Sequence, residues 1–185
     1  MRKIIVEPYN PKWKEEFNKA KCFYENLLEN INMKVEHVGS TSVEGLWAKP
    51  ILDIDIIIEN KEDSKKSIEL LESVGYKHIG NLGIEGRQML KYDPNNPKIT
   101  WMEHHLYVCM KDSENLINHL LLRNHLRNNK QSVELYSKLK RKLADKYTND
   151  IDSYIEGKTE LITSILKSEG MESEELDRIT NINSK

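Results

Sequence analysis

The stretch EHVGSTSVEGLWAKPILDIDIIIE, residues 36–59, places a turn of small residues ahead of an apolar run that contains two aspartates. The apolar run, residues 50–59, predicts a central β-strand, because it is nearly continuous in Leu and Ile. Side chains alternate along a strand, so Asp53 and Asp55 project from one face and their apolar neighbours from the other. Aspartate is depleted in strands, and two of them on one face indicate a role beyond packing.

A divalent cation is the role that the two aspartates predict. Neighbouring carboxylates repel each other, and burying them without partners is costly. Mg²⁺ or Mn²⁺ removes this cost, since Mg²⁺ takes one or two carboxylates together with phosphate oxygens and water. The turn offers the phosphate side, because glycine lets the backbone approach and hydroxyls and amides follow it: Gly39, Ser40, Thr41 and Ser42. The alternative is a capped turn followed by an edge strand with two exposed acids.

The rest of the chain alternates helices and strands and ends in helices alone. An Asn-Pro pair at 10–11 begins a helix whose apolar residues, within 13–31, form one stripe. Asp63 is expected to cap a second helix, which Gly75 ends. Further strands are expected at 34–38, 87–92 and 100–110, and further helices at 114–128, 132–147 and 152–168. This order predicts an α+β fold with a C-terminal helical lobe.

Length and composition indicate one globular domain. The 185 residues are 38% hydrophobic and carry a net charge of -2, which argues against a protein built mainly to coat nucleic acid. No apolar run approaches the length of a membrane span, and the two cysteines lack metal-type spacing, so reduced thiols in a cytoplasm are expected. We expect one domain over 1–168, with its sheet part at 1–111, its helical part at 112–168, and a flexible acidic tail at 169–185.

The order of these motifs resembles a known superfamily. Gly-Ser, a spacer of about a dozen residues and then two aspartates alternating with apolar residues is similar to the signature of polymerase-β-like nucleotidyltransferases. Longer blocks resemble one branch of it, the GrpB (UPF0157) family: VEPYNPKW, HVGSTSVEGLWAKPILDID, HHLYV, LLRNHLR and YSKLKRKLADKY…YIEGK, spanning roughly residues 6–160. The resemblance implies a mixed β-sheet flanked by helices.

The same resemblance implies a reaction. A nucleotidyl group would pass from an NTP to an unidentified acceptor, with Mg²⁺ or Mn²⁺ as cofactor. Direct in-line transfer is favoured, because the sequence offers no obvious nucleophile of its own. Two alternatives stay open: a nucleotide- or phosphoester-binding module that has lost catalysis, and a metal-dependent phosphohydrolase.

A third metal ligand is the point at which this chain departs from the superfamily. Active members generally add a third carboxylate from a neighbouring strand, and the GrpB pattern places His105 there. By strand alternation, Glu103 shares the face of His105 and could supply a hard ligand instead. We therefore expect Asp53, Asp55, His105 and Glu103 to be catalytic residues, the first three of them metal ligands. The alternative for His105 is a surface histidine.

Several cations and aromatic residues could neutralise charge on the phosphates. Pairs spaced by four residues share a helix face, and such pairs recur on the last three helices. The predicted nucleotide- and phosphate-binding residues outside the turn are His37, Lys49, Arg87, Arg123, Arg127, Tyr136, Lys140 and Lys158. For each helical pair the alternative is an ordinary solvated helix face.

Overall fold

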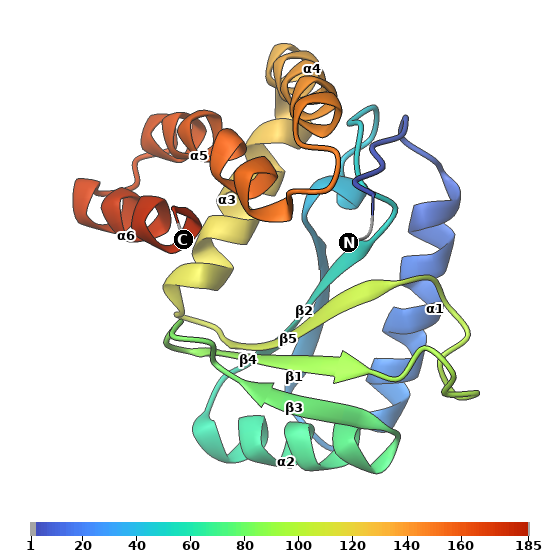
Figure 1. Cartoon of the computed structure of the whole chain (residues 1–185). Coiled ribbons are helices and arrows are strands. Elements are labelled where there is room, and N and C mark those ends of the chain that lie inside the picture. The colour runs from blue at the N-terminus through green and yellow to red at the C-terminus, as the bar shows by residue number, and fades with distance from the viewer. Residues whose placement is uncertain (1–2, 185) are drawn as a thin grey trace.

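One five-stranded mixed sheet organises the fold (Figure 1), and the computed structural model describes residues 3–184. The strand order is β1-β2-β5-β4-β3. β2 and β5 run parallel, and the other neighbouring pairs run antiparallel. The strands are β1 (Met33–Val38), β2 (Leu52–Ile58), β3 (Tyr76–Gly80), β4 (Arg87–Tyr92) and β5 (His104–Met110). The α+β class predicted from the sequence is confirmed.

Helices cover both faces of this sheet. They are α1 (Lys12–Leu27), α2 (Lys61–Ser73), α3 (Glu114–Asn128), α4 (Lys130–Lys146), α5 (Ile151–Ser168) and α6 (Ser173–Asn183), with a short 3₁₀ turn, η1, at Ser40–Ser42. The helices α3 to α6 gather on one side as a lobe, while α1 and α2 lie away from it (Figure 1). Within residues 3–184, none of the helices combines the length and the apolar character that a membrane span needs.

The main core lies between the sheet and the first two helices. Leu52, Ile54 and Ile56 of β2 are fully buried there, against the α1 stripe that begins with Trp13 and against Leu71 of α2. Strand alternation therefore directs the two aspartates of β2 to the opposite face, toward the helical lobe. The predicted division of the strand into an apolar and a carboxylate face is confirmed.

The predicted tail is a helix, which corrects the expectation of a flexible segment from residue 169. Glu172 forms a capping box with Glu175 at the start of α6. Met171 and Leu176 are buried against Leu166 of α5. The segment has few apolar residues, but α5 offers a surface on which these two suffice, and only the tertiary structure reveals that surface. Residue 185 lies outside the described residues.

Smaller differences concern element boundaries. β3 was not predicted; it is a short edge strand that pairs only with β4 within the sheet. The cap of α2 is Asn60, whose side chain accepts a hydrogen bond from Asp63 N (2.9 Å). β5 begins at His104 rather than at residue 100, because the preceding segment packs irregularly around the buried Trp101.

Candidate functional site

The two carboxylates lie next to each other on the lobe side of the sheet. In the parallel register of β2 and β5, Asp53 is level with His105 and Asp55 is level with Tyr107. The Asp53 side chain is 32% exposed, whereas that of Asp55 is fully buried. One acid therefore faces the solvent and the other lies in the interior.

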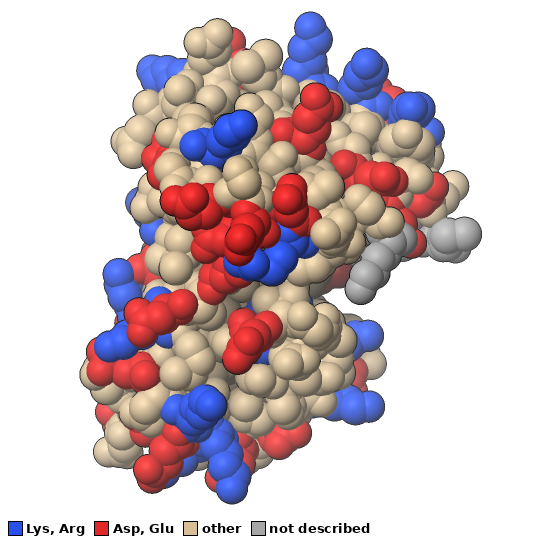
Figure 2. Space-filling view, turned by 90° about the vertical axis from the view of Figure 1, so that its left-hand side faces the viewer, with Lys and Arg blue, Asp and Glu red and all other residues tan. Residues whose placement is uncertain are grey.

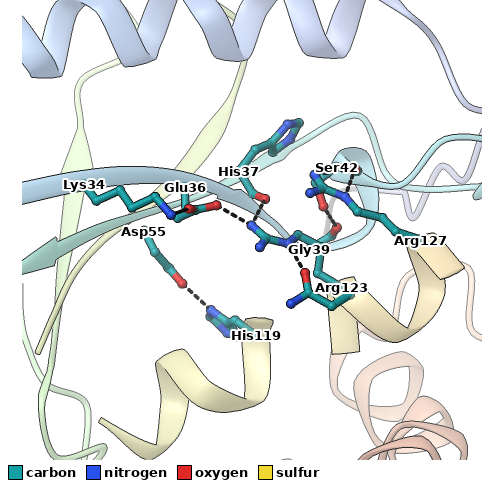
Figure 3. Close-up of polar contacts among 10 residues, drawn as sticks. Lys34, Glu36, His37, Gly39, Ser42, Asp55, His119, Arg123 and Arg127 are labelled. Atoms are coloured by element: carbon teal, nitrogen blue, oxygen red, sulfur yellow. Dashed lines mark hydrogen bonds and ion pairs between the residues drawn. The ribbon is translucent and has the colours of Figure 1, made fainter. Parts of the chain in front are cut away.

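Each carboxylate is paired with a histidine. His105 Nδ1 donates to Asp53 Oδ1 (2.9 Å), and His119 Nδ1 donates to Asp55 Oδ2 (2.8 Å; Figure 3). Burial acts to raise the pKa of Asp53, but the hydrogen bond and charge of His105 outweigh it, so the pKa is lowered. Burial acts to lower the pKa of His119, and the charge and hydrogen bond of Asp55 reverse this, so the pKa is raised. The repulsion expected between the aspartates is thus offset by imidazoles.

His119 is a site residue that the sequence reasoning missed. It lies on α3, and its partner Asp55 is 64 residues away in the chain. A signal was present, because His119, Arg123 and Arg127 follow one another at intervals of four and share one helix face. The arginine pair was recognised, but the same four-residue spacing was not followed back to His119.

The glycine of the turn touches the outer carboxylate. Gly39 has φ +66 and ψ -170, a conformation that is nearly restricted to glycine. A Cβ atom built on it would lie 2.1 Å from Asp53 Oδ2. The turn that was expected to bind phosphate and the acid that was expected to bind metal are therefore in direct contact.

The three hydroxyl residues of the turn have different surroundings. Thr41 is buried, where its hydroxyl donates to Ile51 O (3.3 Å) and contacts His37 Nε2 (3.0 Å). Ser42 Oγ donates to Gly39 O (2.7 Å) and closes the turn. Ser40 lines the cleft over the sheet. The geometry presents Ser40 to a ligand and uses the other two hydroxyls inside the protein.

A group of lysines from the helical lobe gathers beside Ser40. Lys140 Nζ donates to Ser40 Oγ (2.6 Å) and to the carbonyl oxygen of Trp47 (2.7 Å), and it lies over the Tyr136 ring. Burial, together with the charge of Lys158, lowers the pKa of Lys140 well below its ordinary value. The residues that the sequence selected on α4 therefore come together at the turn.

Two more lysines share one aromatic ring in this group. Lys158 and Lys49 lie 4.7 Å and 5.8 Å from the centre of the Tyr154 ring. Burial and the charge of Lys49 lower the pKa of Lys158 to about 8. Asp53 acts in the opposite direction on Lys158, which places this cation within electrostatic reach of the carboxylates.

The two arginines of α3 hold the turn from behind. Arg123 donates to Glu36 and to the carbonyl oxygen of His37, and Arg127 donates twice to Ser42 O (3.1 and 2.9 Å; Figure 3). Both side chains are therefore engaged in fixing the backbone around Gly39. The structure places them as supports of the turn at residues 39–42.

His37 is turned into the core. Its ring stacks on Phe17 with centroids 4.5 Å apart, and burial lowers its pKa to about 4. The ring is therefore neutral at ordinary pH and buttresses the turn through Thr41. The expectation that His37 binds phosphate directly does not fit this placement. Its position beside the turn did not decide whether the side chain would point into the core or toward the cleft.

Arg87 lies at the other end of the cleft. It is level with Cys109 in β5 and hence with Ile57 in β2, four residues beyond Asp53. Its guanidinium stacks over the Tyr107 ring, 4.8 Å from the centroid. The structure therefore separates Arg87 from the lysine group.

Glu103 lies outside the strand. β5 begins at His104, so strand alternation does not determine where the Glu103 side chain points. Its carbonyl oxygen accepts a hydrogen bond from Leu52 N (2.9 Å) and aligns the start of β2 with β5.

The donor set suits a hard cation that is shared with a phosphate. Within residues 3–184, no three His, Cys, Asp or Glu side chains are grouped as metal ligands. Two carboxylates are enough for Mg²⁺ when phosphate oxygens and water complete the shell. Among the described residues, Asp55 Oδ1 is buried without a hydrogen-bond partner, which leaves one carboxylate oxygen for a cation. Asp53 and Asp55 fit a site of this kind.

The site faces a single large cleft between the sheet and the helical lobe. The cleft has a volume of about 1830 Å³, and its walls include Gly39, Ser40, Asp53 and His119.

The sequence profile described as GrpB protein matches residues 3–168. The chain belongs to the GrpB family.

Two GrpB relatives match this chain over nearly their whole length. The glutamate-rich protein GrpB of Alkalihalophilus pseudofirmus is 30% identical over 164 residues, which are 88% of this chain and 94% of the relative. The crystal structure of the conserved protein GrpB from Enterococcus faecalis matches with a TM-score of 0.76 and 34% identity, over 94% of this chain and 98% of that one. GrpB proteins are thus similar to this chain along both the sheet and the lobe.

A more distant structure identifies the wider fold. The Cid1 poly(U) polymerase with MgGTP bound matches with a TM-score of 0.54 and 15% identity, over 76% of this chain and 44% of that one. At this identity the likeness concerns the fold alone. The GrpB domain described here has a nucleotidyltransferase-type fold.

Proposed function

We propose that this GrpB protein is a Mg²⁺- or Mn²⁺-dependent nucleotidyltransferase that passes a nucleotidyl group from an NTP to an acceptor. The observation that carries the proposal is the contact of Gly39 with Asp53. It joins a backbone turn suited to phosphate and a carboxylate pair suited to metal in one cleft. The nucleotidyltransferase-type fold shared with the Cid1 poly(U) polymerase supports the same reaction class.

The triphosphate is expected to lie on the turn. Ser40, Lys140 and Lys158 would bind its terminal phosphates, because they are grouped where the turn meets the helical lobe. Lys49 adds charge from the loop ahead of β2. A metal on Asp53 and Asp55 would neutralise charge on the reacting phosphate. The buried lysines are poised for this, since an anion beside them restores the charged form that burial disfavours.

His105 is the residue proposed to accept the proton of the acceptor hydroxyl. Its Nδ1 is held by Asp53, and its side chain is 39% exposed, so the ring is both oriented and accessible. General-base catalysis of this kind contributes about 10²–10⁴-fold to a rate.

The two unpaired cysteines, Cys22 and Cys109, are in keeping with a cytoplasmic setting.

The test compares His105→Ala with the wild type in two measurements. Pyrophosphate release is followed with each NTP over a panel of acceptors, and binding of a non-hydrolysable NTP with Mg²⁺ is measured by calorimetry. The expected result is loss of release with binding retained. His125→Ala is the matched control, because His125 lies on α3 but bonds to Glu169 and Ser132 away from the carboxylates.

A nucleotide-binding module without catalysis is the second candidate. It is favoured by His105, which the family resemblance places where the superfamily generally has a third acid, and by His119, which occupies one oxygen of Asp55. A wild-type protein that binds the NTP tightly and never releases pyrophosphate would establish this reading. Release of phosphate without an acceptor would instead identify a phosphohydrolase.

A further inference from the structure

Buried polar atoms without hydrogen-bond partners gather at the end of the cleft away from the turn on which the triphosphate is expected to lie. Within residues 3–184, six buried side-chain nitrogen or oxygen atoms have no hydrogen-bond partner. Four of these six belong to neighbouring residues at this end: Arg87 Nε, Ser113 Oγ, Asn115 Nδ2 and Asn118 Oδ1. Folded proteins leave few such atoms, and a group of them in one place is a standing cost that a bound ligand can relieve.

The fold brings these atoms together through a close contact of β4 with the start of α3. Gly86 has φ +73, and a Cβ atom on it would lie 2.6 Å from Ser113 Cβ. This contact sets Arg87 beside the first turn of α3, where it donates to Asn115 Oδ1 (3.3 Å). Ser113 and Asn115 are 7% and 9% exposed, and both line the cleft. The residues that carry these atoms therefore all line the same cleft, with the atoms themselves buried in its wall.

This group of atoms attracts anions. Ser113 is the N-cap of α3 but forms no side-chain cap bond, so the free N–H groups and the positive end of the helix add to the field. Arg87 forms no ion pair with another described residue and touches only an aromatic ring and a neutral amide. Arg87 Nε, Asn115 Nδ2 and the Ser113 hydroxyl are all donors, while Asn118 Oδ1 accepts.

This group lies toward the end of the cleft away from the turn. Arg87 is level with Ile57, which lies four residue steps beyond Asp53, a backbone distance of about 13 Å along the strand. Asp55 and His119 lie between the two ends. A molecule bound at Arg87 would therefore approach the carboxylates from the side opposite to the turn.

We propose that Arg87, Ser113, Asn115 and Asn118 form the subsite of the acceptor, and that the acceptor is a small molecule with an oxyanion group and a hydroxyl. The proposal rests on the nucleotidyltransferase function proposed above. The guanidinium and the donors bind the carboxylate or phosphate, and Asn118 Oδ1 receives a hydroxyl. In the transfer, the acceptor oxygen bonds to the α-phosphorus, pyrophosphate leaves, and the hydroxyl proton passes to His105.

The rim of this end favours a small acceptor over a polynucleotide. α6 lies across it, where Arg178 pairs with Glu114 at the start of α3 (3.0 Å) and Ile179 and Ile182 line the wall. The cleft is also lined by acidic residues: Glu69, Glu72, Glu85, Asp112 and Glu114. Figure 2 shows acidic side chains gathered across the middle of this face. A polynucleotide would meet these acids along its length, whereas a small acceptor places its single oxyanion group at Arg87.

The experiment measures binding of three probes to the full chain by calorimetry: glycerol 3-phosphate, glycerate and glycerol. Each anion keeps two of the three hydroxyls of glycerol and carries a phosphate or a carboxylate in place of the third, so the two anions separate a phosphate from a carboxylate. We expect at least one anion to bind and glycerol not to bind. Arg87→Met should weaken the anion about tenfold to hundredfold, the effect of one bond to a charged group. Arg141→Met is the matched control, since Arg141 stacks on Trp47 outside this subsite.

Asn115→Asp keeps the test decisive if Arg87→Met fails to fold. The new carboxylate would stand where Asn115 Oδ1 now accepts the hydrogen bond of Arg87, so the protein should fold at least as well. The same carboxylate would occupy Arg87 and repel the anion, so binding of the anion should be lost. Equal binding of glycerol and the anions, or no effect of Asn115→Asp, would overturn the proposal. Loss of NTP binding in Arg87→Met would show that Arg87 serves the triphosphate instead. A wild type that binds the anion but no NTP would reject the transferase and keep the subsite.

Discussion

Gly39→Ala is expected to damage both the stability and the nucleotide site, because one added carbon meets the carboxylate of Asp53. The new Cβ would lie 2.1 Å from Asp53 Oδ2, and real Cβ contacts essentially never fall below 3.0 Å, so the atoms must separate by 0.9 Å or more. A move of this size away from Gly39 is enough to break the 2.9 Å bond between Asp53 and His105.

The loss of stability has two parts. The conformation of Gly39, φ +66 and ψ -170, costs another residue about 1–3 kcal/mol. The bond between Asp53 and His105 is charge-assisted but partly exposed, so its loss adds about 1 kcal/mol. We therefore expect the free energy of unfolding to fall by about 2–4 kcal/mol.

Urea denaturation, followed by circular dichroism, measures this loss. Gly83→Ala is the matched control, because Gly83 has φ +78 but no atom within 4 Å of its Cβ position, so only backbone strain applies. In the double variant of Gly39→Ala with Asp53→Gly the clash disappears, because all three atoms that the new Cβ would meet belong to the Asp53 side chain, and the summed losses should not be reached. A Gly39→Ala loss no larger than that of Gly83→Ala, or strict additivity in the double variant, would refute the contact between turn and carboxylate.

Two other predictions concern the lysine group and the last helix. Burial lowers the pKa of Lys158 to about 8, so this cation loses its charge as the pH rises through that value. Affinity for a non-hydrolysable NTP should therefore fall between pH 7 and pH 9, and Lys158→Arg should remove most of the fall, since arginine stays charged; an identical profile in both proteins would contradict the role of Lys158. A chain ending at residue 168 loses the buried Met171 and Leu176, at about 1.5–3 kcal/mol each. Its melting temperature should drop by several degrees in calorimetry, and an unchanged value would mean that α6 contributes little to the packing.

The division of β2 into two faces could be predicted from the sequence, because strand geometry is local. Alternation alone directs Asp53 and Asp55 to one side, and that side is the one that faces the helical lobe. The glycine turn was readable for the same reason, since its special backbone is a property of a few consecutive residues. The longer blocks around the turn and the acids led to the right family, and the order of strands and helices led to the right fold class.

The partners of these groups were decided only by the tertiary structure. Lys140 meets Ser40 across 100 residues of chain, and His119 meets Asp55 across 64. A helix pattern shows which residues share a face, but it does not show which other element that face will pack against. For the same reason the arginines of α3 were recognised as a pair, while their position behind the turn was not.

The burial of single groups was likewise a tertiary outcome. His37 is level with Ile54 in the sheet, so its ring points to the core face, where it stacks on Phe17 and burial keeps it neutral. Arg87 looked equivalent to the other cations in the sequence, yet the sheet order sets it at the far end of the cleft. Local periodicity determined which side chains share a face, and the packing of distant elements determined which of them meet a ligand together.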